Sequence, residues 1–223
     1  MTILRKYVAL SDAFTEWLGN LPVYIVLITI FVGFLNVVLR YTGQEIGLKL
    51  TNNVVIELQW YLYTLIFLLG FSYILKNQVN VRVDFWFADQ SPKVKAIIDL
   101  IGHFIALLPF CLLALYITWN PIRSSWGVLP NGEWCFENES TTTLDRVLYF
   151  VDILDLSGRY CGEISPDPNG LNRAPIKSVI YLAFLFLLLQ AIAEVIKLAS
   201  VLAGKQEAFG LTLPETEAPI RIE

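Results

Sequence analysis

Long runs of apolar residues, separated by short polar stretches, make up most of this chain. A helix needs about 20 consecutive apolar residues to cross the roughly 30 Å hydrocarbon core of a bilayer, because lipid offers no partner for backbone polar groups. The apolar runs of this length cover residues 21–39, 54–75, 96–119 and 176–196. The pattern therefore predicts an all-α integral membrane protein with four transmembrane helices, in a membrane domain of residues 21–203.

The N-terminal segment carries a different pattern. Leu4, Val8, Phe14 and Leu18 recur at helical spacing among polar residues. Such spacing predicts an amphipathic helix over residues 1–20 that lies at the membrane interface. Acidic residues interrupt the segment, so we do not expect a cleaved signal peptide here.

Two further segments lie outside the apolar runs. Residues 120–175 form a long polar loop in which Thr142 and Asp145 match a helix-capping pattern, followed by apolar residues at helical spacing up to residue 151. This predicts a short amphipathic helix within the loop. Residues 204–223 contain prolines and charges of both signs and are expected to form a flexible tail.

The basic residues predict the orientation of the spans, since Lys and Arg accumulate in cytoplasmic loops. The loop between the second and third runs is the most basic, with Lys76, Arg82, Lys93 and Lys95. The loop of residues 120–175 is mainly acidic. We therefore expect both termini in the cytoplasm and the long loop outside.

Composition narrows the class of function. Hydrophobic residues make up 56% and charged residues 16%, against about 45–50% and about 25% in soluble domains. The net charge of −4 argues against nucleic acid as a partner. His103 is the single histidine, which excludes a haem held by two histidines. Nucleotide-binding loops, zinc-ligand spacing and Ser/His/Asp arrangements do not occur in the sequence, so we expect neither an enzyme nor a cofactor bound by this chain.

Polar and ionisable residues inside the apolar runs are costly and mark surfaces that face protein or water. They are Glu57 and Gln59, then Asp99 and His103, and then Gln190 and Glu194. One interpretation is a proton relay or a cation site. The other is hydrogen bonding between helices or to a partner subunit. Because these residues lie towards the ends of the runs and not at mid-depth, we favour the structural or subunit-contact interpretation.

Two of the cysteines fall in the loop predicted to be external. Cys135 and Cys161 lie in a compartment that would permit a disulfide, which would close a loop of about 26 residues and contribute about 3 kcal/mol. The sequence leaves open whether they are bridged. Cys111, inside the third run, is expected to act as a small apolar residue.

Several short motifs follow one another along the chain. The chain reads NVVLRY at the end of the first run, ELQW (Glu57 to Trp60) in the second, VRVD (Val81 to Asp84) in the following loop, and LPF in the third. Residues 162–171 read GEISPDPNGL. In order and spacing, these motifs resemble the small membrane subunit of tripartite ATP-independent periplasmic (TRAP) transporters, the DctQ-like family.

The chain departs from that family's pattern at two places. Asn80 stands where the family usually has a histidine before the VRVD segment, and residues 128–161 resemble an insertion that lengthens the external loop. The insertion puts the docking of an external partner in doubt. Arg82 and Asp84 alternate with apolar residues, which predicts an extended segment whose charges pair within the assembled complex.

The resemblance implies a complex in the bacterial cytoplasmic (inner) membrane. Its other parts are a large permease subunit, which carries the Na⁺ and substrate sites, and a periplasmic substrate-binding protein. This chain would scaffold the large subunit during cation-gradient-driven uptake of a solute, with a carboxylate expected. The alternatives are a membrane anchor or assembly subunit of an electron-transfer complex and a free-standing small channel.

Overall fold

Helices dominate the computed structural model, which describes residues 2–79, 87, 90–135, 162–168 and 170–204. The helices are α1 (Thr2–Ile46), α2 (Asn53–Lys76), α4 (Pro92–Gly102), the π-helix η1 (His103–Leu107), α5 (Leu108–Ser125) and α7 (Ala174–Leu202). Four helical stretches are long and apolar enough to cross a membrane: α1, α2, the run from Lys93 to Ser125, and α7. The prediction of an all-helical protein with four membrane spans is confirmed.

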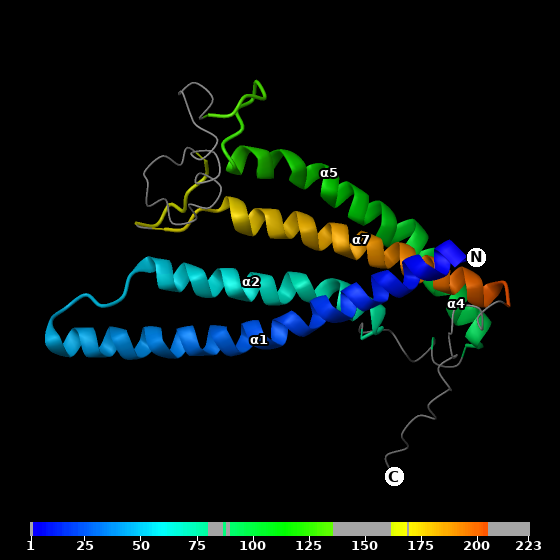
Figure 1. Ribbon diagram of the computed structural model, residues 1–223, viewed down its shortest axis with the longest axis horizontal. Helices are drawn as coiled ribbons and strands as arrows, with labels where there is room; N and C mark the ends of the chain where they lie inside the picture. The colour runs from blue at the N-terminus through cyan, green and yellow to red at the C-terminus, as the bar shows by residue number, and fades with distance from the viewer. Residues whose placement is uncertain (1, 80–86, 88–89, 136–161, 169, 205–223) are drawn as a thin grey trace, which may run out of the picture.

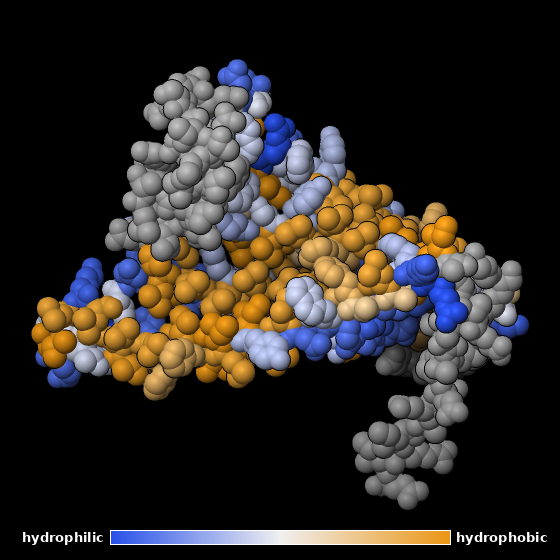
Figure 2. Space-filling model, in the orientation of Figure 1, coloured by the Kyte–Doolittle hydropathy of each residue, from blue (hydrophilic) through white to orange (hydrophobic). Residues whose placement is uncertain are grey.

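Over most of their length the helices lie side by side in the order α5, α7, α2, α1, and the N-terminal part of α1 crosses α2 to reach α7 (Figure 1). α7 packs against all the others, and α1 packs against both α2 and α7. In the most apolar window of α7, 33% of residues are buried, against 6% in each of the other three spans. Apolar side chains cover most of the visible face of the helices (Figure 2). The core of the molecule therefore follows α7, and the remaining faces are apolar and exposed.

α1 joins two segments that the sequence analysis separated. The interfacial helix expected at residues 1–20 and the span expected at 21–39 form one helix, Thr2–Ile46, which continues through Pro22. At 1.5 Å per residue it is roughly 67 Å long, about twice the bilayer core. Polar residues of the first segment contact α7 and α2, so the two predicted segments are continuous as one helix, and the interfacial placement of residues 1–20 is not tested by this continuity. The position of α1 relative to a membrane stays a prediction.

Two glycines allow α1 and α2 to approach closely. A Cβ atom built on Gly19 would lie 2.1 Å from the ring of Tyr73, and one on Gly33 would lie 2.7 Å from Nε2 of Gln59. A side chain at Gly19 would force the helices apart, whereas one at Gly33 would displace the end of the Gln59 side chain. This explains where Gln59 lies: it packs over Gly33 at the α1–α2 contact.

The third span is longer than expected and changes its helix type in the middle. It begins at Pro92, after Ser91, whose hydroxyl accepts a hydrogen bond from the backbone N–H of Val94 at 3.5 Å. The π-helix η1 ends two residues before Pro109. Because proline has no N–H and its ring crowds the preceding turn, a wider turn relieves both problems.

The helix ends fall into two groups. α1 begins at the end of the layer where α2 and α7 end, and the opposite end holds the start of α2, the start of α7 and the end of α5 (Figure 1). We call these the inner end and the outer end, after the predicted orientation. Which side of the membrane each one faces stays a prediction. The helix expected near residues 144–151 and the tail from residue 205 lie outside the described residues.

Candidate functional site

A short hairpin, which we call the outer hairpin, covers the outer end. It consists of residues 163–168 and 170–173 and is held by backbone hydrogen bonds from Ser165 to Leu171 (3.1 Å) and from Arg173 to Glu163 (3.0 Å). At its turn, a Cβ on Gly170 would lie 2.3 Å from Cβ of Ser165. Only glycine therefore fits at this position without moving the hairpin.

One face of α2 holds the outer hairpin. Glu57 accepts hydrogen bonds from the hydroxyl of Ser165 and from the backbone N–H of Leu171, the latter at 2.5 Å. Asn53 and Tyr61, one helical turn on either side of Glu57, donate to backbone carbonyls of the hairpin at 3.3 and 3.1 Å. The predicted site residue Glu57 is thus the central member of a stripe that fixes the loop to the helix.

Glu163 of the outer hairpin joins α5 to α7. Its carboxylate accepts hydrogen bonds from Lys177 and, at 2.7 Å, from the hydroxyl of Ser125, and it lies 3.8 Å from the guanidinium of Arg173. The hydrogen bonds from Lys177 and Ser125 hold the pKa of Glu163 below its ordinary value. This network fixes the end of α5 relative to the start of α7.

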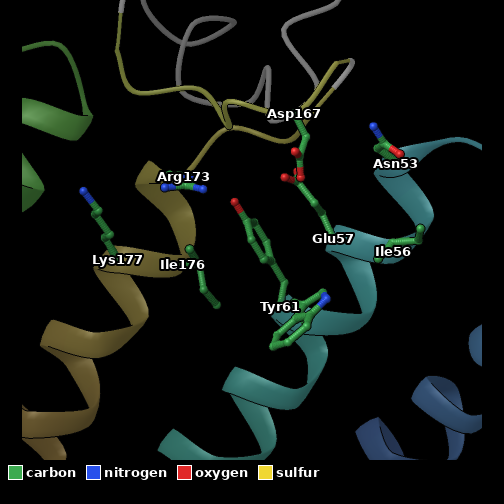
Figure 3. A pocket seen from close by; sticks show the side chains of 9 residues that line it. Asn53, Ile56, Glu57, Tyr61, Asp167, Arg173, Ile176 and Lys177 are labelled. Carbon is green, nitrogen blue, oxygen red and sulfur yellow. The ribbon is translucent and has the colours of Figure 1, made fainter.

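A pocket of 510 Å³ lies between the first turns of α2 and α7, beneath the outer hairpin. In Figure 3 the side chains of Glu57 and Asp167 lie together on the α2 side and Arg173 lies on the α7 side, with Tyr61 between them. Trp60 also lines the pocket and is 69% exposed. The pocket therefore combines charges of both signs with an exposed aromatic ring.

A second polar cluster, which we call the inner network, centres on Gln190 in α7. Its side-chain oxygen accepts hydrogen bonds from Ser11 (2.9 Å) and Thr15 (2.8 Å), and its amide donates to Asp12 (2.9 Å) and Glu194 (2.9 Å). Gln190 is completely buried and Glu194 is 5% exposed. All four hydrogen bonds of the amide group are therefore made within the chain, and two of the predicted site residues lie together here.

Two lysines pair with the carboxylates at and beside the inner network. Lys197 contacts Glu194 at 2.6 Å and Asp12 at 3.0 Å. Lys76, at the end of α2, pairs with Glu16 of α1 at 2.5 Å. The first part of α1 is thereby tied to both α7 and α2 by charged groups.

Asp99 and His103 are joined through the backbone. Nδ1 of His103 lies 2.6 Å from the carbonyl oxygen of Asp99, so Nδ1 must donate the hydrogen bond. In the described part of the chain, Nε2 of His103 is buried without a hydrogen-bond partner. The histidine lies at the first residue of the π-helix η1.

The other predicted site residues are only partly described. Arg82, Asp84 and Cys161 lie outside the described residues. Cys135 is disulfide-bonded. Because Cys161 is not among the described residues, its pairing with Cys135 stays a prediction. Cys111 is a buried free cysteine. Among the described residues, no group of three or more His, Cys, Asp or Glu side chains is arranged to hold a metal ion.

Sequence reasoning missed the partners of the residues that it identified. Ser11, Asp12 and Thr15 of α1 and Lys197 of α7 are these partners. Their i,i+3 and i,i+4 spacing was a usable signal, since such residues share one face of a helix. The residues of the outer hairpin were noted for their resemblance to a family but not assigned to Glu57.

Comparison with known proteins gives a match to a family described as tripartite ATP-independent periplasmic transporters, DctQ component, over residues 29–142. The match covers just over half of the chain, from within α1 through α5 and beyond. No curated protein and no solved structure matches the chain.

Proposed function

The chain belongs to the DctQ component family of tripartite ATP-independent periplasmic transporters, and on this premise we propose that it scaffolds the large permease subunit of such a transporter. This family is a transport component and not a family of enzymes. The complex would take up a solute, with a carboxylate expected, at the expense of a cation gradient, with Na⁺ as the expected ion. The large subunit would carry both sites, and a periplasmic binding protein would deliver the solute.

The observation that supports this proposal most is the layered arrangement of the spans. In the described part of the chain, the spans pack around α7, and only 6% of the most apolar window of each other span is buried, so these spans bury little surface that could enclose a path for a solute. Their apolar faces remain exposed, with long runs of exposed residues in α1 and α5. Such a layer widens the membrane footprint of a subunit packed against it.

The charged residues of the inner network also favour a structural role. Glu194 and Asp12 are both within 3.0 Å of Lys197, and both accept a hydrogen bond from the amide of Gln190, so each carboxylate has a cationic partner and a hydrogen-bond donor within the chain. Ion sites in secondary transporters are typically built at broken helices near mid-membrane. α7 continues without a break past Gln190 and Glu194.

We assign the complex to the bacterial inner membrane, with both ends of this chain in the cytoplasm and the outer hairpin in the periplasm. The basic stretch between α2 and α4 supports this orientation. The alternative of an anchor for an electron-transfer complex receives no support from the family match.

The test combines co-purification with transport. A tag on this chain should recover a large permease subunit from native membranes, and deleting the chain should abolish uptake. Replacing Asp99 by Asn and Glu194 by Gln removes charge but keeps hydrogen bonding. Uptake by this double variant should keep the sodium concentration for half-maximal rate, with the maximal rate following the amount of complex.

Glu45→Gln is the matched control, since Glu45 is an exposed carboxylate at the far end of α1. Recovery of the tagged chain as a monomer from native membranes would contradict the scaffold. A shifted sodium dependence in the double variant, at an unchanged level of complex, would place these carboxylates in the ion path instead.

A further inference from the structure

The pocket between α2 and α7 has separated charges that are incompletely balanced by the protein. Among the described residues, neither Glu57 nor Asp167 has an ion-pair partner, and both line the pocket. On the opposite wall, Arg173 is 42% exposed at its side chain and has Glu163 only at 3.8 Å. Its planar guanidinium carries five N–H donors, so most of them remain available to a ligand.

The position of the pocket points to a ligand from the membrane. It lies at the first turns of two spans, where the apolar part of each helix begins. Trp60 on its wall is 69% exposed, and exposed tryptophan is enriched at the headgroup level of a bilayer. Ile56 and Ile176 extend the lining towards the apolar faces of α2 and α7.

The arrangement of the charges selects the type of ligand. A simple anion at Arg173 would leave the two carboxylates uncompensated, and a simple cation at the carboxylates would leave the guanidinium without a partner. A zwitterion satisfies both walls. The two kinds of charge lie on opposite sides of Tyr61 (Figure 3), as the phosphate and the amine of one lipid headgroup would require.

We propose that this pocket binds the headgroup of a phospholipid that carries a primary ammonium group, such as phosphatidylethanolamine. Arg173 binds the phosphate oxygens, Asp167 and Glu57 accept hydrogen bonds from the ammonium, and the acyl chains lie along the apolar faces below. The bound lipid fills the space between α2 and α7 at the outer end. This inference goes beyond the scaffold role and does not rest on it.

The test measures lipid binding by the full chain, purified with its accompanying subunits and stripped of lipid in mild detergent. Dioleoyl phosphatidylethanolamine and dioleoyl phosphatidylglycerol are titrated separately, and bound lipid is counted by native mass spectrometry. We expect the ethanolamine lipid to bind about tenfold more tightly, since hydrogen bonds between charged groups are lost with the glycerol headgroup. Water-soluble glycerophosphoethanolamine should not displace it at equal concentration.

Two variants assign the binding to the pocket. Arg173→Gln and Asp167→Asn should each weaken the binding of the ethanolamine lipid about tenfold, and both leave the contacts of Glu57 to the outer hairpin intact. Arg123→Gln, also at the outer end but outside this pocket, is the control and should bind like the unmodified chain. The unfolding temperature of each variant shows whether it is folded.

Equal affinity for the two lipids would overturn the proposal, as would variants that bind like the Arg123→Gln control. Displacement of the lipid by the soluble headgroup at equal concentration would assign the pocket to a water-soluble zwitterion instead. None of these results depends on transport, so they leave the scaffold role to its own test.

Discussion

α7 carries a polar cluster near each of its ends, and the two clusters differ in how they are built. In the inner network, helix packs on helix: Gln190 is fully buried, and the side chain of Lys197 is 12% exposed. In the outer cluster a loop packs on helix ends, and the side chains of Glu163 and Lys177 are 37% and 30% exposed. Water therefore weakens the outer ion pair, while the inner one is shielded.

The largest effect is expected from removing the central cation of the inner network. Lys197→Met leaves the carboxylates of Asp12 and Glu194 near each other without their shared partner. Breaking a buried ion pair in this way costs on the order of 3–5 kcal/mol. The midpoint of unfolding in denaturing detergent should fall strongly, and the first four turns of α1 should lose protection from hydrogen exchange.

The matched control is Lys177→Met, on the same helix but in the exposed outer cluster. Its cost should be about 1 kcal/mol or less, because the ion pair with Glu163 is partly solvated. If the two variants are equally stable, burial does not distinguish the two ends of α7, and the comparison fails.

The same contrast explains what the sequence could predict. The four spans follow from the length of the apolar runs, since lipid permits few other structures for such segments. Gln190 and Glu194 were identified because polar groups in a span need partners. Their partners on α1 could not be identified from the sequence, because a polar helix face that contacts another polar helix has the same residue pattern as one that contacts water.

The outer cluster was harder to predict for a different reason. Glu57 contacts residues more than 100 positions away along the chain, at Ser165 and Leu171. Helical periodicity within one segment carries no information about such a contact. The glycine at 170 was a usable signal, because a turn with a close contact requires it, but the sequence does not indicate which helix the turn meets.

An intermediate effect is expected at that turn. Gly170→Ala places a Cβ 2.3 Å from Cβ of Ser165, so the outer hairpin must shift and pull Leu171 away from Glu57. Overpacking of this kind costs roughly 1–3 kcal/mol. Hydrogen exchange should increase in the hairpin and at the start of α2, while the inner network stays protected.

Gly102→Ala is the control for this substitution. A Cβ at Gly102 meets nothing within 4 Å, and alanine favours a helix more than glycine does. Its unfolding midpoint should stay the same or rise. Increased exchange in the inner network of Gly170→Ala would show that the two ends of α7 are coupled, and would contradict their independence.

The smallest effect is expected from acidification, and it should be confined to the outer cluster. The folded pKa of Glu163 lies below the ordinary value of 4.5, because Lys177 and Ser125 hydrogen-bond to its ionised carboxylate. Ionised Glu163 therefore stabilises the fold above pH 4.5, and this contribution is lost as the pH falls through the folded pKa. Between about pH 6 and about pH 3.5, the hydrogen-exchange protection of the Glu163 and Arg173 amides, corrected for the intrinsic exchange rate, should decrease.

Glu163→Gln cannot ionise, so its outer hairpin should be less protected near neutral pH and should lose little more on acidification. If the variant and the unmodified chain lose protection in parallel, the loss does not come from Glu163, and the ion pair of Glu163 does not hold the hairpin.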